Sequence, residues 1–402
     1  MSALSELAAG ALARGDALTA LSLAGRLHGA SSLLLRGVAY AQLGDVDLAR
    51  TTLQRCLTAG PSPLEGARAE AALVEIAVAH DSPRAAAHAA RASVTRLTRL
   101  GDHRNAAMQQ LVLARIEVLL GRLAEARALV DAVALRPLAP DLRAVAWLAS
   151  AELAIREGAA TTARTALTSA RRTLLRSPHA LLSRALSALE AELVRPLARL
   201  QTSAGIEAAD LFAVERAARD ALLVDACRCA VVRGSDHLAL ARRPVIFRLL
   251  RLLAQAWPEP AMRDDLGREG FDVRHLNPSH RARLRVEMGR LRVLLRPLAA
   301  SVEATSTGYV LRAPGAAVKV LLPLAEDESA RAAFLLGDGA AWSTRQLAEH
   351  AGISMRTAQR ALAALLAKGE VVRVGAGSSL RYLRPGAPLA SRMLLLGLVP
   401  TV

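Results

Sequence analysis

Apolar and polar positions in the first 200 residues recur with a helical period, and strand-like alternation is almost absent there. Residues 207–219 continue the pattern as one amphipathic helix. From residue 222 onward, short β-rich runs alternate with helical stretches, and turn residues separate them. The pattern predicts a mainly α protein whose C-terminal half carries several short hairpins.

The clearest internal repeat spans residues 33–61, where small residues recur at fixed spacing. Gly37 and Ala49 are small enough for the two helices of a hairpin to cross closely, and larger residues fill the next layer. The spacing is similar to that of the tetratricopeptide repeat, which implies about five helical hairpins stacked into a curved solenoid with a concave face. A weaker copy of the pattern contains Trp147, Ala151, Gly158, Ala163, Leu167 and Ala170.

A second block begins with β-rich runs at residues 222–232 and 237–241, followed by three predicted helices and a hairpin at 302–312. The predicted helices cover 242–258, 261–268 and 279–296. This order resembles the OmpR/PhoB type of winged helix. The residues that carry the resemblance are Pro244, Phe247, Leu249, Leu250, Leu284, Met288, Leu291, Gly308 and Tyr309.

The third helix of this block would be the recognition helix. A buried stripe is expected at Leu284, Met288, Leu291 and Leu295, which turns the opposite face outward. On that outward face, the resemblance implies that an apolar side chain meets a thymine methyl group and an arginine one turn later binds a base or phosphate. The wing tip lacks the basic residue usual in the family, and Phe271 replaces the usual tryptophan. We expect DNA contacts from Arg281, Arg283, Val286, Arg290 and Thr307.

Residues 343–383 predict a helix, a tight turn, a second helix capped by Ser354, and a hairpin. This arrangement resembles the winged helix-turn-helix of the MarR and GntR types of regulator. Ala358, Ala361, Leu362 and Leu365 are expected to face the core. The resemblance implies DNA contacts from Arg356, Thr357, Gln359 and Arg360 on the second helix and from Arg373 and Arg381 on the wing.

Positive charge is concentrated in one part of the chain. The formal net charge is +16, and arginine carries nearly all the positive charge, since Lys319 and Lys368 are the only lysines. Residues 240–312 hold 14 arginines against 7 acidic residues. Such a basic segment is expected where a surface neutralises phosphates, although a solvated arginine face is the alternative interpretation.

Motifs for catalysis and cofactor binding are absent from the sequence. It contains no phosphate-binding loop of the Walker type, no nucleophile elbow and no zinc-protease motif, so we expect no catalytic residue and no cofactor. Cys56, Cys227 and Cys229 do not have metal-ligand spacing. His275 and His280 are interpreted as loop or phosphate contacts. With no signal peptide and no apolar run of 18 residues, we expect a cytoplasmic, nucleoid-associated protein and no membrane partner.

Together these features predict a sequence-specific DNA-binding transcriptional regulator, with double-stranded DNA as its partner. The helical repeats would sense a signal, bind a partner protein or form a homodimer, or would serve mainly as a packing platform. The alternative is a protein-interaction scaffold, or a subunit of a larger defence or repair assembly, whose winged helices bind protein. The predicted boundaries are 1–200 for the helical repeats, 201–220 for a helical connector, 221–313 for the first winged helix, 314–324 for a linker, 325–386 for the second winged helix and 387–402 for a tail.

Overall fold

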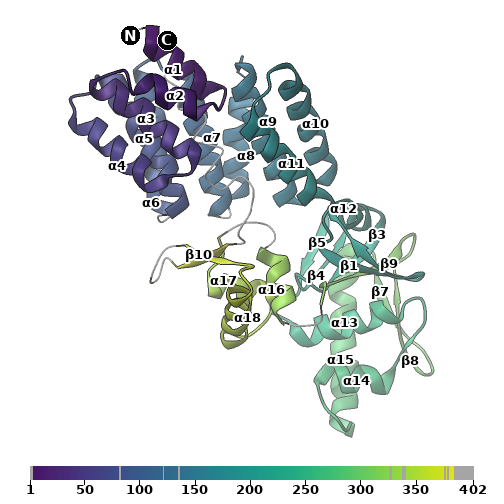
Figure 1. The fold of residues 1–402 in the computed structure, drawn as a ribbon. Coiled ribbons are helices and arrows are strands. Elements are labelled where there is room, and N and C mark those ends of the chain that lie inside the picture. Colours follow the sequence, from purple (N-terminus) through teal and green to yellow (C-terminus); the bar gives the residue numbers. More distant parts are fainter. Residues whose placement is uncertain are drawn as a thin grey trace. The chain divides into compact units, whose positions relative to one another are not determined.

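The computed structural model describes residues 3–80, 83–120, 122–134, 136–325, 328–336, 341–374, 377 and 380–383. The predicted tail at 387–402 lies outside the described residues, as does most of the predicted wing loop, at 375, 376, 378 and 379. The chain is mainly helical, as predicted, and a mixed sheet lies in its C-terminal part (Figure 1). It forms two compact units, one containing the helices of residues 3–193 and the other containing residues 194–336 and 342–372.

Helices alone make up the described part of residues 3–193 (Figure 1). They are α1 (Ala3–Ala13), α2 (Ala17–Ala24), α3 (Gly29–Leu43), α4 (Val46–Thr58), α5 (Pro63–His80), α6 (Pro83–Arg99), α7 (His103–Leu119), α8 (Leu123–Ala134), α9 (Pro140–Glu157), α10 (Ala160–Arg176) and α11 (Ala180–Val194). From α1 to α10 each helix packs against the next. From α1 to α9, each odd-numbered helix also contacts the following odd-numbered helix.

The pattern of buried residues explains why odd-numbered helices such as α9 pack against one another while even-numbered helices such as α10 cover them. Helix α9 buries residues on all its faces, whereas α10 buries a single stripe that includes Ala163, Ala166, Leu167 and Ala170. A helix covered on all sides lies inside, and an amphipathic helix lies outside it. The close crossing predicted at Gly37 is confirmed, because a Cβ atom there would lie 2.6 Å from Leu53 Cγ of α4.

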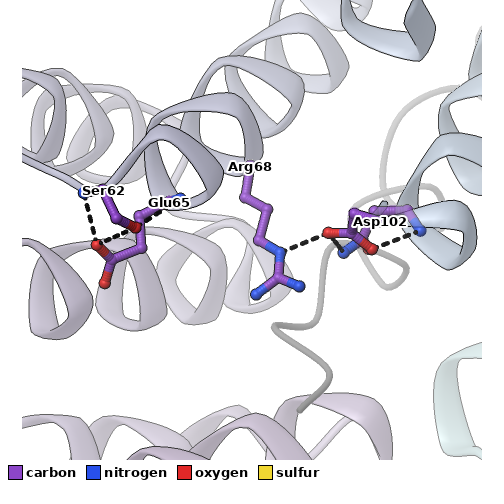
Figure 2. A network of polar contacts seen from close by, with 5 residues as sticks. Ser62, Glu65, Arg68 and Asp102 are labelled. Carbon is purple, nitrogen blue, oxygen red and sulfur yellow. Dashed lines mark hydrogen bonds and ion pairs between the residues drawn. The ribbon is translucent and has the colours of Figure 1, made fainter. Parts of the chain in front are cut away.

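A buried ion pair joins α5 to α7 (Figure 2). Arg68 Nε donates to Asp102 Oδ2 over 2.6 Å, and both side chains are almost fully buried. Asp102 also caps α7, since its carboxylate accepts bonds from the backbone N–H and the side-chain amide of Asn105. At the start of α5, Ser62 and Glu65 bond to each other in the same way as a capping box. These polar groups fix where the two helices begin.

Further polar groups lie inside the helical unit. Gln109 Nε2 of α7 donates to Glu75 Oε1 of α5 over 2.8 Å. Burial raises the pKa of the Glu75 carboxyl well above its usual range. Deeper along α7, Arg115 forms an ion pair with Glu152 of α9, and both side chains are buried. Polar side chains therefore connect the odd-numbered helices at several levels.

The second unit is built on a six-stranded sheet with the order β2-β1-β9-β3-β4-β5. Neighbouring strands are antiparallel except β3 and β9, which are parallel. The strands are β1 (Ala198–Thr202), β2 (Gly205–Ala209), β3 (Ala221–Asp225), β4 (Ala230–Arg233), β5 (Asp236–Ala239) and β9 (Ala317–Leu322).

Two predicted connections are instead parts of this sheet. Residues 201–220, predicted as a helical connector, contain the end of β1, strand β2 and a helix that begins at Leu211. Residues 314–324, predicted as a linker, contain β9, which pairs with both β1 and β3. Val318 and Val320 are buried in the core on one face of the sheet, and Leu321 is buried on the other. Burial on both faces explains why this segment is a strand rather than a flexible link.

Residues 211–312 of this unit also form helices and a smaller, three-stranded sheet. They are α12 (Leu211–Asp220), α13 (Pro244–Ala256), α14 (Arg263–Phe271), α15 (Pro278–Leu295), the short 3₁₀ helix η1 (Arg296–Leu298), and the strands β6 (Ala261–Met262), β7 (Ser301–Ala304) and β8 (Gly308–Arg312), in the order β6-β8-β7. The predicted helix at 261–268 was wrong at its start. Ala261 pairs with Tyr309 of β8, and this pairing needs Gly308, where a Cβ atom would lie 1.9 Å from the Ala261 carbonyl oxygen.

The last described elements are α16 (Glu328–Leu336), α17 (Thr344–Ala351), α18 (Met355–Ala367), β10 (Val372–Val374) and β11 (Arg381–Leu383). The predicted cap is confirmed, because Ser354 Oγ accepts the backbone N–H of Thr357 at the start of α18. The predicted core stripe is also confirmed, since Ala358, Ala361, Leu362 and Leu365 are all buried. Strands β10 and β11 pair as a two-stranded sheet.

Candidate nucleic-acid interface

Helix α15 presents an exposed face with several arginines. The predicted stripe of Leu284, Met288, Leu291 and Leu295 is buried in the core. Asn277 and His280 form a capping box at the helix start, where Pro278 occupies the first turn. As a consequence, the candidate contact residues on the opposite face are all exposed, and they are Arg281, Arg283, Val286 and Arg290.

Neighbouring side chains hold these arginines in place. Arg290 donates to Glu287 over 3.0 Å, and the Arg283 guanidinium lies over the Phe271 ring, 4.8 Å from its centroid. Arg281 lies 3.7 Å from a carboxylate oxygen of Asp264. The exposed pair of Arg281 and Asp264 contributes about 1 kcal/mol or less, so Arg281 can exchange its partner for a phosphate at low cost.

A pocket of about 500 Å³ lies between α15 and the start of α13. Arg243, Arg283 and Arg290 line it together with Glu287 and the first residues of α13. At the helix start no side chain caps the backbone N–H groups, which carry the positive end of the helix dipole. Such a pocket suits a phosphate group. Arg243 was not predicted, although two arginines directly before a proline at a helix start were a usable signal.

The β7–β8 hairpin contains Thr307, the predicted wing contact. Arg263, from the first turn of α14, donates its backbone N–H to the Thr307 carbonyl over 3.1 Å and its guanidinium to the Thr305 carbonyl over 3.0 Å. Arg263 is exposed. The tip therefore has a basic side chain beside it, even though the hairpin sequence itself has none. The sequence does not identify Arg263 as a neighbour of the hairpin, because the two segments are far apart along the chain.

Helix α18 carries four candidate contact residues. Arg356, Gln359 and Arg360 are exposed on it, so their polar groups can reach a ligand. Thr357 is half-buried, and its hydroxyl accepts a hydrogen bond from Ser354 Oγ over 2.9 Å. Its side chain thus belongs to the helix cap, which makes it the weakest of the four candidates.

The remaining two candidates, Arg373 and Arg381, lie on β10 and β11. Arg373 is exposed, whereas Arg381 is half-buried and donates to the carbonyl of Leu380 over 2.9 Å. By their contacts both residues group with the first compact unit.

Possible metal ligands do not cluster within the part of the chain that the structure describes. In it no three histidine, cysteine or acidic side chains gather where a metal ion could bind, and no helix is both long and apolar enough to cross a membrane. The three cysteines are free and buried. Burial raises the pKa of the Cys56 thiol to about 11 and also raises that of Cys227 and Cys229, so the thiols stay protonated at neutral pH.

No protein-family model, no curated protein and no solved structure matches this chain.

Proposed function

We propose that this protein is a sequence-specific DNA-binding transcriptional regulator that reads DNA with two winged helices. The first would comprise α13–α15 with the β7–β8 hairpin as its wing. Helices α16–α18 would be the helical part of the second, which is predicted at residues 325–386. In each, one recognition helix, α15 or α18, would lie in a major groove. The helices of residues 3–193 would form a tetratricopeptide-like solenoid that binds a partner protein, a signal or a second copy of the chain.

The observation that carries this proposal is the pocket beside α15. Three arginines and an uncapped helix start converge there, next to the exposed face of a helix whose other face is buried. A phosphate bound in the pocket would position α15 on the duplex, and Val286 with Arg290 would meet base edges. On α18, Arg356 and Arg360 would act as the corresponding positive pair.

A second candidate function is a protein-interaction scaffold. It is favoured by apolar side chains on the outward face of α15, where Val286 is 53% exposed and Val293 is 58% exposed. Exposed apolar groups on one face are typical of protein contacts. The same valines would suit thymine methyl groups in the DNA interpretation, so the two functions must be separated by experiment.

The salt dependence of DNA binding tests the proposal. Binding of the full-length protein to random-sequence duplex should weaken with salt, with a log–log slope of about −0.9 for each phosphate contact. Arg356→Ala/Arg360→Ala should make that slope shallower by about 1 to 2. Fluorescence anisotropy titrations at several salt concentrations measure it.

The matched control is Arg171→Ala/Arg172→Ala, which removes the same charge from exposed positions on α10. It should leave the slope unchanged. Equal effects of both double variants would mean that binding depends only on total charge. No duplex binding at any salt concentration would favour the scaffold function.

A further inference from the structure

The α16–α18 helices pack against the six-stranded sheet within the second compact unit. Part of the contact is made by the turn between β3 and β4, residues 226–229, which we call the docking turn. The Arg228 guanidinium lies over the Phe334 ring of α16, 4.7 Å from its centroid. Cys229 Sγ lies 3.5 Å from the Ala351 carbonyl oxygen at the end of α17 and donates to it. The docking turn thus contacts two of the three helices.

The docking turn is held in one conformation by its own sequence. Asp225 Oδ1 accepts the backbone N–H groups of Cys227 and Arg228 over 2.8 and 2.9 Å. Cys229 has a φ of 52°, a left-handed conformation that non-glycine residues rarely adopt. A buried carboxylate at Asp225 that accepts two backbone N–H groups, followed by an unusual backbone angle at Cys229, indicates a turn with one defined conformation, as expected at a fixed contact.

Residues of α16 and α17 also pack closely against the sheet and the segment that follows it. Phe334 packs against the apolar cluster on one face of the sheet, which includes Leu223, Cys227 and Leu321. Gly352, at the end of α17, has a φ of 64°, and a Cβ atom there would lie 3.1 Å from the Ala241 carbonyl oxygen and 3.5 Å from Cys229 Sγ. Apolar packing, a cation–π contact and a close backbone approach therefore hold the helices on the sheet.

We propose that these contacts fix α15 and α18 in one relative position, so that the protein recognises a composite DNA site with a single permitted spacing between its two parts. This inference rests on the proposed DNA-binding function and adds the form of the binding site. One base pair inserted between the parts moves them by about 3.4 Å along the duplex axis and about one tenth of a turn around it. A rigid pair of helices cannot follow that change, whereas flexibly joined modules can.

Gly352→Asn tests the contact, and Gly369→Asn is its matched control. Both glycines have positive φ angles that asparagine tolerates, but a Cβ atom at Gly369 would meet no atom of the described residues within 4 Å. The control therefore carries the same backbone cost without touching the docking turn. An affinity selection of random duplex DNA with the wild type first identifies the preferred sequence. Both variants and the wild type are then compared on duplexes carrying that sequence, with base pairs inserted or removed between its two parts.

Wild type and Gly369→Asn should lose about tenfold or more in affinity when one base pair is inserted. Gly352→Asn should change by less than about threefold across the same series, with a lower affinity at the preferred spacing because the second contact depends on effective concentration. A wild-type protein that tolerates every spacing equally would overturn the inference.

Alkylation of Cys229 provides a readout that does not depend on DNA. Cys229 is 6% exposed in the docked arrangement, and trypsin cleavage after Arg228 separates it from Cys227 for mass spectrometry. The native wild type and Gly369→Asn should be protected, and Gly352→Asn should be labelled at least about tenfold faster. Rapid labelling of the native wild type would overturn the fixed contact alone. Protection of Cys229 in a protein that selects no DNA sequence would instead overturn the proposed function and, with it, the composite site.

Discussion

Replacing Asp102 with alanine should lower the free energy of unfolding of the helical unit by about 3–5 kcal/mol. The substitution leaves the Arg68 guanidinium buried without its carboxylate partner, and it also removes the side-chain cap of α7. Removing one partner of a buried ion pair is among the most destabilising changes that one substitution can cause. Chemical denaturation followed by circular dichroism, with hydrogen exchange of the α5 and α7 amides, measures the loss.

Asp45→Ala is the matched control, because Asp45 caps α4 through the Leu48 N–H from an exposed position. It should cost about 0.5–2 kcal/mol, the usual contribution of a cap. Arg68→Met/Asp102→Ala should recover part of the stability, since it removes the buried guanidinium as well. The role assigned to the ion pair would be refuted if Asp102→Ala cost no more than Asp45→Ala.

Replacing Glu75 with glutamine should stabilise the protein at neutral and alkaline pH and have little effect near pH 4. An unfolded glutamate titrates near pH 4.3, roughly, whereas burial holds the pKa of Glu75 well above that value in the folded state. Below the unfolded pKa the carboxyl is neutral in both states. As the pH rises from there through the folded pKa, the unfolded state releases its proton more readily, so folding stability falls.

Glutamine keeps a neutral hydrogen-bonding group beside Gln109 and removes this loss, which amounts to about 1.4 kcal/mol for each unit by which the pKa is raised. Thermal unfolding of both proteins from acidic to alkaline pH measures the effect. Glu70→Gln, at an exposed position of the same helix, is the control and should change stability by less than about 1 kcal/mol at every pH. A stability gain for Glu75→Gln that is the same at all pH values would contradict the explanation.

Local sequence patterns predicted the helices and their buried faces well. The 3.6-residue period identified the buried stripes of α15 and α18, and Ser354 identified the start of α18, because capping depends on neighbouring residues only. Gly37 indicated a close crossing for the same reason: glycine in a regular apolar pattern marks a place without room for a side chain.

Contacts between distant segments could not be predicted in the same way. Strand β9 lies between β1 and β3, and the proline and glycine before it gave the segment the composition of a linker. Arg243 and Arg263 join the candidate interface only because folding brings α13 and α14 beside α15 and the hairpin. The ion pair between Arg68 and Asp102 also spans two helices, and nothing in either local sequence identifies its partner.

The most direct test of the proposed function is an affinity selection of random duplex DNA with the full-length protein at near-physiological salt, followed by sequencing. It is repeated with Arg290→Ala and with Arg356→Ala/Arg360→Ala. We expect an enriched two-part sequence, of which the first variant loses one part and the second variant loses the other. Only salt-sensitive binding with no enriched sequence would contradict a regulator that reads DNA with α15 and α18.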